Sequence, residues 1–137
     1  MDISLEQKIT NKFRLLIILS IISVLVSIFS LVSIARINLI LTFDRQEHRA
    51  RELVERVVYS INQHRDYYKN YCNQNAIADI NENISKITAN YEIILLETEL
   101  GHYEFDLIFD GENKFSVYVE QGSNGSLKVT NFSPLLK

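Results

Sequence analysis

Three histidines and one cysteine are the side chains of this sequence best suited to binding a transition metal. Such ligands form a site when they recur at short, regular spacings. His48, His64 and His102 stand far apart, and none has a ligand-type spacing to another or to Cys72. We therefore expect no metal and no cofactor. His64 falls on the apolar side of a predicted helix, where we expect a partly buried imidazole.

Carboxylates offer two other kinds of chemistry, calcium binding and acid–base catalysis. Asp110 and Glu112 lie in "DGENKFSVYVE", which lacks the central glycine and ligand order of a calcium loop and predicts a hairpin turn. Glu104, Asp106 and Glu120 alternate with apolar residues, so we expect them on a solvent-facing sheet surface and not in a pocket that would perturb one of them. There is no phosphate loop, nucleophile elbow or Cys–His pairing. We predict that the protein is not an enzyme.

Charge is distributed unevenly along the 137 residues. Residues 44–90 hold seven basic and seven acidic side chains, whereas residues 91–137 hold three lysines and eight carboxylates, a net charge of −5. An acidic surface repels a phosphate backbone, so we expect no nucleic-acid partner. The single cysteine excludes an internal disulfide.

Residues 15–35 read "LLIILSIISVLVSIFSLVSIA" and contain no charge, glycine or proline. At 1.5 Å per residue this stretch makes a helix about 31 Å long, close to the thickness of the hydrocarbon core of a bilayer. We predict a transmembrane helix over 15–35, apolar to about residue 43, after a short N-terminal tail, residues 1–14. The lipid bilayer is then the first partner of the chain.

Serines recur through this predicted helix at intervals of three and four residues. On a helical wheel four of them fall within an arc of about 80°, and Ser33 lies off that arc. Small polar residues let helices approach and hydrogen-bond in lipid, so the arc predicts a contact face for a second copy or another membrane protein. The alternative is that serine is a tolerated filler, because each hydroxyl can bond the carbonyl one turn earlier. The four candidate interface residues are Ser20, Ser23, Ser27 and Ser30.

The flanks of the apolar stretch bear on cleavage and orientation. Lys8, Lys12 and Arg14 form a positive N-terminal region, and "SIA" at 33–35 fits a cleavage site, but the stretch is longer than the apolar region of a cleaved signal, about 7–15 residues. We predict an uncleaved signal-anchor. A strict count of Lys and Arg favours a cytoplasmic C-terminal side, yet long domains translocate largely regardless of charge. We choose the orientation with the C-terminal domain outside the cytoplasm.

Residues 44–137 predict a small α+β domain that begins with an amphipathic helix over about 44–72. Four tyrosines of this helix predict either a contact patch for a partner or ordinary helix–sheet packing, which we favour. They are Tyr59 and Tyr67, which do not share the apolar side, and Tyr68 and Tyr71, which do. A narrower stripe of isoleucines predicts a short second helix over about 76–89. The apolar side of the first helix comprises Ala50, Leu53, Val54, Val57, Val58, Ile61, Tyr68, Tyr71 and Cys72, and the isoleucine stripe Ile77, Ile80, Ile84 and Ile87.

From residue 91 to about 132 the apolar period changes to two, which predicts a four-stranded antiparallel meander. The segments "DGEN" and "QGSNG" have the composition of turns. A register that pairs Phe109 with Phe115, and Val119 with Leu127, places the apolar residues on one face. That face needs a cover, and the amphipathic helix can supply it.

A long helix, apolar in its first half and amphipathic in its second, followed by such a meander, resembles the layout of type IV pilins and pseudopilins over residues 13–137. That family carries a glycine just before the apolar run and an acid at its fifth position. The segment "ITNKFRLLIIL" has no glycine, and no acid follows Glu6 there. The resemblance implies a pilin-like subunit that lacks the usual processing motif, and no site residue is carried over.

Together these features predict a non-enzymatic, single-pass membrane protein, a structural or accessory subunit of a membrane assembly that presents a small extracytoplasmic domain to a partner. A small ligand-binding sensor component is the alternative. A sensor needs a pocket and usually a cytoplasmic output region, and the short N-terminal tail offers few residues for that role.

Overall fold

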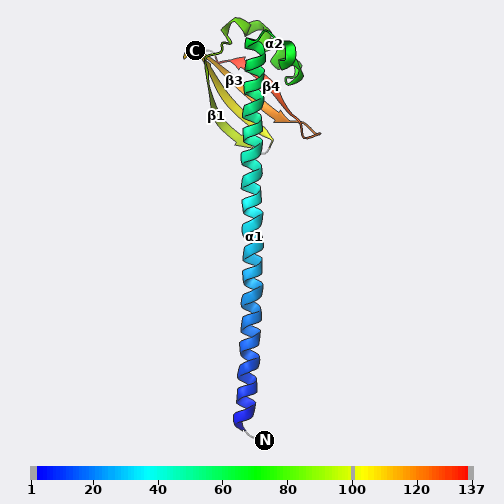
Figure 1. The fold of residues 1–137 in the computed structure, drawn as a ribbon, viewed down its shortest axis with the longest axis vertical. Helices are drawn as coiled ribbons and strands as arrows, with labels where there is room; N and C mark the ends of the chain where they lie inside the picture. Colours follow the sequence, from blue (N-terminus) through cyan, green and yellow to red (C-terminus); the bar gives the residue numbers. More distant parts are fainter. Residues whose placement is uncertain (1–2, 100, 136–137) are drawn as a thin grey trace. The chain divides into compact units, whose positions relative to one another are not determined.

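The chain has the predicted α+β class: a long N-terminal helix, a short second helix and a four-stranded antiparallel sheet (Figure 1). The computed structural model describes residues 3–99 and 101–135. The first two residues of the predicted tail and the last two of the predicted domain lie outside these ranges. In chain order the elements are α1 (Ile3–Asn62), η1 (Asp66–Asn70), α2 (Gln74–Asn83), η2 (Ile84–Lys86), β1 (Tyr91–Glu99), β2 (His102–Phe109), β3 (Asn113–Gln121) and β4 (Leu127–Pro134).

The chain divides into two compact units, residues 1–42 and residues 43–137. In the first unit the described chain is helical, because α1 begins at Ile3 and therefore includes most of the predicted tail. Of the side chains described over 7–42, only Ser33 is half-buried, and the others are exposed. This unit therefore has no core of its own within the described residues.

In the second unit, the part of α1 from residue 43 onward buries one face. Ala50, Val54, Val57 and Val58 are fully buried, whereas Tyr59 is 63 % exposed. Residues three and four apart share a helix face, so this pattern confirms the predicted apolar stripe over these positions.

The predicted helix over 44–72 is wrong at its C-terminal end, because α1 ends at Asn62. His64 adopts a left-handed conformation, with a φ of 53°, and the Arg65 N–H donates to the Ser60 carbonyl at 3.0 Å, which closes the last turn. The His64 side chain is exposed and not partly buried as expected. Tyr68 is buried as predicted, but it belongs to the separate 3-10 helix η1 and not to α1.

The second helix also differs from its predicted bounds, 76–89. The Asn73 side chain accepts a hydrogen bond from the Ala76 N–H at 2.8 Å, so α2 starts at Gln74. The α-helix gives way to η2 at Ile84, which turns Ile84 out of the predicted isoleucine stripe and leaves it 46 % exposed. Ile80 and Ile87 remain buried, and Ile77 is half-buried.

The strands form a meander in the order β1-β2-β3-β4, as predicted, but the predicted register is wrong. Phe115 pairs with Leu107, two residues from the predicted partner, because Asn113 pairs with Phe109 and only residues 110–112 form the loop. Val119 likewise pairs with Val129 and not with Leu127. A shift of two keeps the side chains of β2 and β3 on their predicted faces. In β4 a bulge changes the alternation, so that Phe132 pairs with Val117 and is buried, although the predicted period of two places it on the polar face.

One core joins the apolar face of the sheet to α1 and α2. On the sheet side, Phe109, Phe115 and Phe132 form a chain of ring contacts with centroids 5.6 Å and 5.4 Å apart. The buried residues of the sheet are Tyr103, Phe105, Leu107, Phe109, Phe115, Val117, Val119, Val129 and Phe132.

The segment between η1 and α2 runs beside β4. Cys72 forms a parallel bridge to Val129, whose N–H donates to the Tyr71 carbonyl at 2.8 Å. The Cys72 side chain is buried here, and burial raises the pKa of its thiol to about 12. The thiol is therefore protonated and inert at neutral pH.

Candidate functional site

The four predicted interface serines lie on α1 in the first unit, and all four are exposed. Because α1 has no break over these residues, their helical spacing keeps them on one arc. The Ser27 hydroxyl donates to the Ser23 carbonyl at 2.9 Å, and Ser33 donates to the Phe29 carbonyl at 2.9 Å. Ser27 thus uses its hydrogen within the helix and keeps only its oxygen for a neighbour. Association through Ser20, Ser23, Ser27 and Ser30 stays a prediction.

Of the sheet's charged side chains, His102 and Glu120 are exposed as predicted, whereas Glu104 and Asp106 are half-buried. One carboxylate oxygen of Asp106 is buried and has no hydrogen-bond partner among the described residues. His102 Nδ1 lies 3.8 Å from a carboxylate oxygen of Glu120, and both side chains are exposed. Glu104 accepts a hydrogen bond from the Tyr118 hydroxyl at 2.9 Å. Over 3–99 and 101–135, no group of three or more His, Cys, Asp or Glu residues is placed to hold a metal ion. These residues do not assemble into a site.

A cavity of about 430 Å³ on the second unit gathers four of its tyrosines. We call it the tyrosine cavity. Tyr59 comes from α1, Tyr67 and Tyr71 come from η1 and its C-terminal end, and Tyr91 begins β1. The remaining lining residues are Glu52, Glu55, Arg56, Ser60 and Arg65. A pocket of this size falls within the range of small-ligand and side-chain sites.

The tyrosine rings differ in exposure. Tyr59 and Tyr67 are 63 % and 61 % exposed, whereas Tyr71 and Tyr91 are half-buried. The Tyr91 ring packs on Phe109 with centroids 5.9 Å apart, which ties this wall to the core. Two tyrosines thus form fixed walls and two stand free in solvent.

Ser60 holds the α1–η1 corner that positions Tyr67. It is buried, its hydroxyl donates to the Arg65 carbonyl at 2.8 Å, and its oxygen accepts from the Tyr68 N–H at 3.0 Å. The Tyr68 hydroxyl in turn donates to the Asn81 side chain at 2.8 Å, which joins η1 to α2. Two backbone groups of the corner therefore depend on one hydroxyl.

Replacing Ser60 with alanine is expected to destabilise the second unit by about 1–3 kcal/mol, because the buried Tyr68 N–H loses its acceptor. The full-length protein in detergent micelles would be melted and followed by near-UV circular dichroism. Ser85→Ala, at an exposed position, is the matched control. Equal melting temperatures for the two variants would contradict the role given to Ser60.

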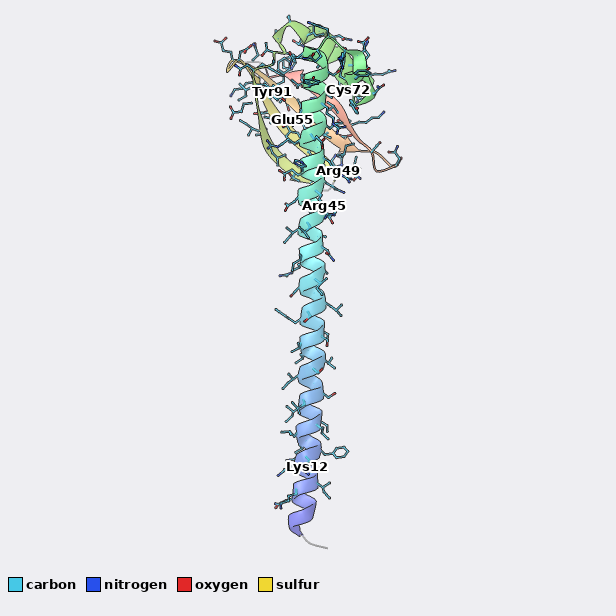
Figure 2. The ribbon with its side chains drawn as sticks, in the orientation of Figure 1. Lys12, Arg45, Arg49, Glu55, Cys72 and Tyr91 are labelled. Carbon is cyan, nitrogen blue, oxygen red and sulfur yellow. The ribbon has the colours of Figure 1, made fainter. Side chains whose placement is uncertain are left out.

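The charges of the tyrosine cavity are only partly paired. Arg56 donates to Glu52 at 2.6 Å, and this hydrogen bond and ion pair raise the pKa of Arg56, with a smaller contribution from Tyr71. Burial raises the pKa of Tyr91, and the nearby Glu55 carboxylate adds to the rise. Glu55 on α1 and Tyr91 are labelled in Figure 2. The negative charge of Glu55 therefore interacts electrostatically with the phenol of Tyr91.

Sequence reasoning singled out three of the four tyrosines but missed Tyr91. Its position at the start of a predicted strand indicated a core or edge residue, and no periodicity relates a strand start to a helix face. Tyr59 and Tyr67 are exposed beside a cavity and so do not pack between helix and sheet as we favoured, and a contact patch for a partner stays a prediction.

No protein-family model matches the sequence, and comparison with curated proteins and with solved structures found no significant match.

Proposed function

We propose that the chain is a non-enzymatic, single-pass membrane protein that holds its second unit outside the cytoplasm and presents it to a partner protein. One observation carries the proposal: Gln7–Asn62 contains a stretch apolar and long enough to cross a membrane, and none of that stretch is buried by the rest of the described chain. A core helix of a soluble protein would bury such residues. Left in water, this surface would be far larger than the apolar patches that soluble monomers expose.

The flanks support an uncleaved signal-anchor. The apolar stretch exceeds the length of a cleaved signal, and α1 continues through it without a break to Asn62. Lys8, Lys12 and Arg14 precede it and form the positive region retained in the cytoplasm. The second unit, with its own core, then follows on the far side.

A phosphatase that is active only outside the cytoplasm, fused after Lys137 in a bacterial host, is expected to be active. A reporter that is active only in the cytoplasm, fused at the same position, is expected to be silent. The control is the same phosphatase fused after Lys12, before the apolar stretch, which should stay inactive because nothing exports it. The reverse pattern at Lys137 would place the second unit in the cytoplasm.

A further inference from the structure

We propose that the tyrosine cavity binds a basic side chain of a partner protein, lysine or arginine, between its tyrosine rings and the Glu55 carboxylate. This inference depends on the proposed function only for the existence of a protein partner. It names the surface of the second unit that meets that partner and the chemistry that it recognises.

The aromatic lining is the first argument. A cation is attracted to the negative face of an aromatic ring, and several rings around one cavity add their contributions. Tyr59 and Tyr67 stand largely exposed at the cavity, although large aromatic side chains usually lose solvent contact by packing. Tyrosine is among the residues enriched in the cores of protein interfaces and in their binding hot spots.

The unpaired carboxylate is the second argument. Glu52 is occupied by Arg56 at 2.6 Å, so that the two charges cancel. Glu55 is half-buried, and no salt bridge of the described chain includes it. A cation that reaches a half-buried carboxylate stabilises its charge. The Glu55 carboxylate lies beside Tyr91, where it can accept such a cation.

Two cations, Arg56 and Arg65, line the cavity and oppose a basic ligand; Arg56 is paired with Glu52, and Arg65 is in no salt bridge of the described residues. Its side chain is exposed, and it also borders a second cavity whose lining includes Asp66 and Tyr67. It therefore stands at the boundary between two cavities and is not enclosed in the tyrosine cavity. Since Arg65 repels a cationic ligand, its removal should strengthen binding of that ligand. The direction of this change therefore tests the proposal.

Long-range charge favours the same kind of partner. Residues 91–137 carry a net charge of −5, and Glu92 and Glu97 lie exposed on β1, the strand that begins with Tyr91. A negative field attracts a basic protein surface and speeds its encounter. A second copy of the chain lacks this complementarity, because it carries the same negative field.

The experiment is fluorine NMR on the full-length chain in detergent micelles, with every tyrosine labelled with fluorine. The resonances of the seven tyrosines are assigned by Tyr→Phe substitution. The probes are blocked lysine and arginine amides, the uncharged norleucine amide and choline. We expect the lysine or arginine probe to shift the resonances of Tyr59, Tyr67 and Tyr91 but not that of Tyr118, which lies outside the cavity. Norleucine should leave all of them in place.

Variants test each part of the cavity. Glu55→Gln should weaken binding of the basic probe by up to about fivefold. Glu112→Gln, the same charge change in the exposed β2–β3 turn, should not. Tyr59→Leu should weaken binding by about two- to fivefold and Tyr59→Phe should retain it, since phenylalanine keeps the ring face. Arg65→Gln should strengthen binding.

Three results would overturn the proposal: no shift with either basic probe, shifts of equal size with norleucine, or tighter binding of choline than of both basic probes, which would assign the cavity to a free organic cation. The fusion experiment is independent of these outcomes. If the phosphatase fusion is active but the basic probes shift no resonance, only the ligand assignment is wrong. If the basic probes bind but the fusion pattern is reversed, only the orientation is wrong.

Discussion

Replacing Leu107 with aspartate is expected to unfold the second unit of the protein. Leu107 is fully buried on the central strand β2, among Phe105, Phe109 and the residues of α1 that cover the sheet. An isolated carboxylate there must either lose its hydration or take up a proton, and either costs several kcal/mol, roughly half or more of the stability of a small domain. Val117→Asp, on the neighbouring strand, should have the same effect.

Near-UV circular dichroism would follow this loss, because the fixed tyrosine and phenylalanine rings supply the signal in a chain without tryptophan. Leu96→Asp is the matched control, since Leu96 is 53 % exposed on the edge strand β1. Its melting curve should stay near that of the parent. A Leu107→Asp variant that melts cooperatively at the parent's temperature would show that this face of the sheet is not the core.

Replacing Ser20, Ser23, Ser27 and Ser30 together with leucine is expected to abolish self-association of the first unit. In lipid there is no hydrophobic drive between apolar helices, so close backbone contact and interhelical hydrogen bonds must supply the association. Each such bond contributes only about 0.6–2 kcal/mol, so one substitution should have little effect. Four leucines on one arc separate the backbones and remove every hydroxyl together.

A two-hybrid assay for membrane helices, with residues 13–43, would measure the change. Ser33→Leu is the control, because Ser33 lies off the arc and bonds its own helix through the Phe29 carbonyl. If the quadruple variant associates as well as the parent, the serines are filler in an apolar helix. If the parent helix does not associate with itself, the four serines do not form a homodimer interface, and another membrane protein becomes their expected partner.

Periodicity alone was sufficient to identify the buried face of β2 and β3. Phe105, Leu107, Val117 and Val119 alternate with polar residues, and all four are fully buried. Alternation is a property of each strand by itself, so it survives any error in how the strands are paired, provided that the error is an even number of residues. The apolar stripe of α1 was predictable for the same reason.

The strand pairing was not predictable from the same pattern. The register between β2 and β3 depends on how many residues close the loop, and Asp110 and Gly111 close it in three because both adopt a positive φ. Asp-Gly permits this conformation, but it also permits longer loops. At the register shift between Tyr118 and Val119 the pairing with β4 changes by one further residue, which brings Phe132 opposite Val117.

The end of α1 and the tyrosine cavity escaped prediction for a related reason. Asn62, Gln63 and His64 contain no glycine or proline, and a wheel extended through them places Tyr68 on the same helix as Val54. In the structure the chain leaves the helix there, and the Ser60 hydroxyl holds the new direction. The cavity forms because this corner meets Tyr91, which is a tertiary contact that no local pattern contains.

The burial of Cys72 has a practical consequence for work in an oxidising environment. Disulfide exchange requires an accessible thiolate, and the folded chain offers neither the access nor the charge. Two copies can therefore lie side by side without becoming covalently linked. A disulfide-linked dimer on a non-reducing gel would come from chains that have unfolded at this position. The amount of that dimer therefore measures the misfolded fraction of a preparation.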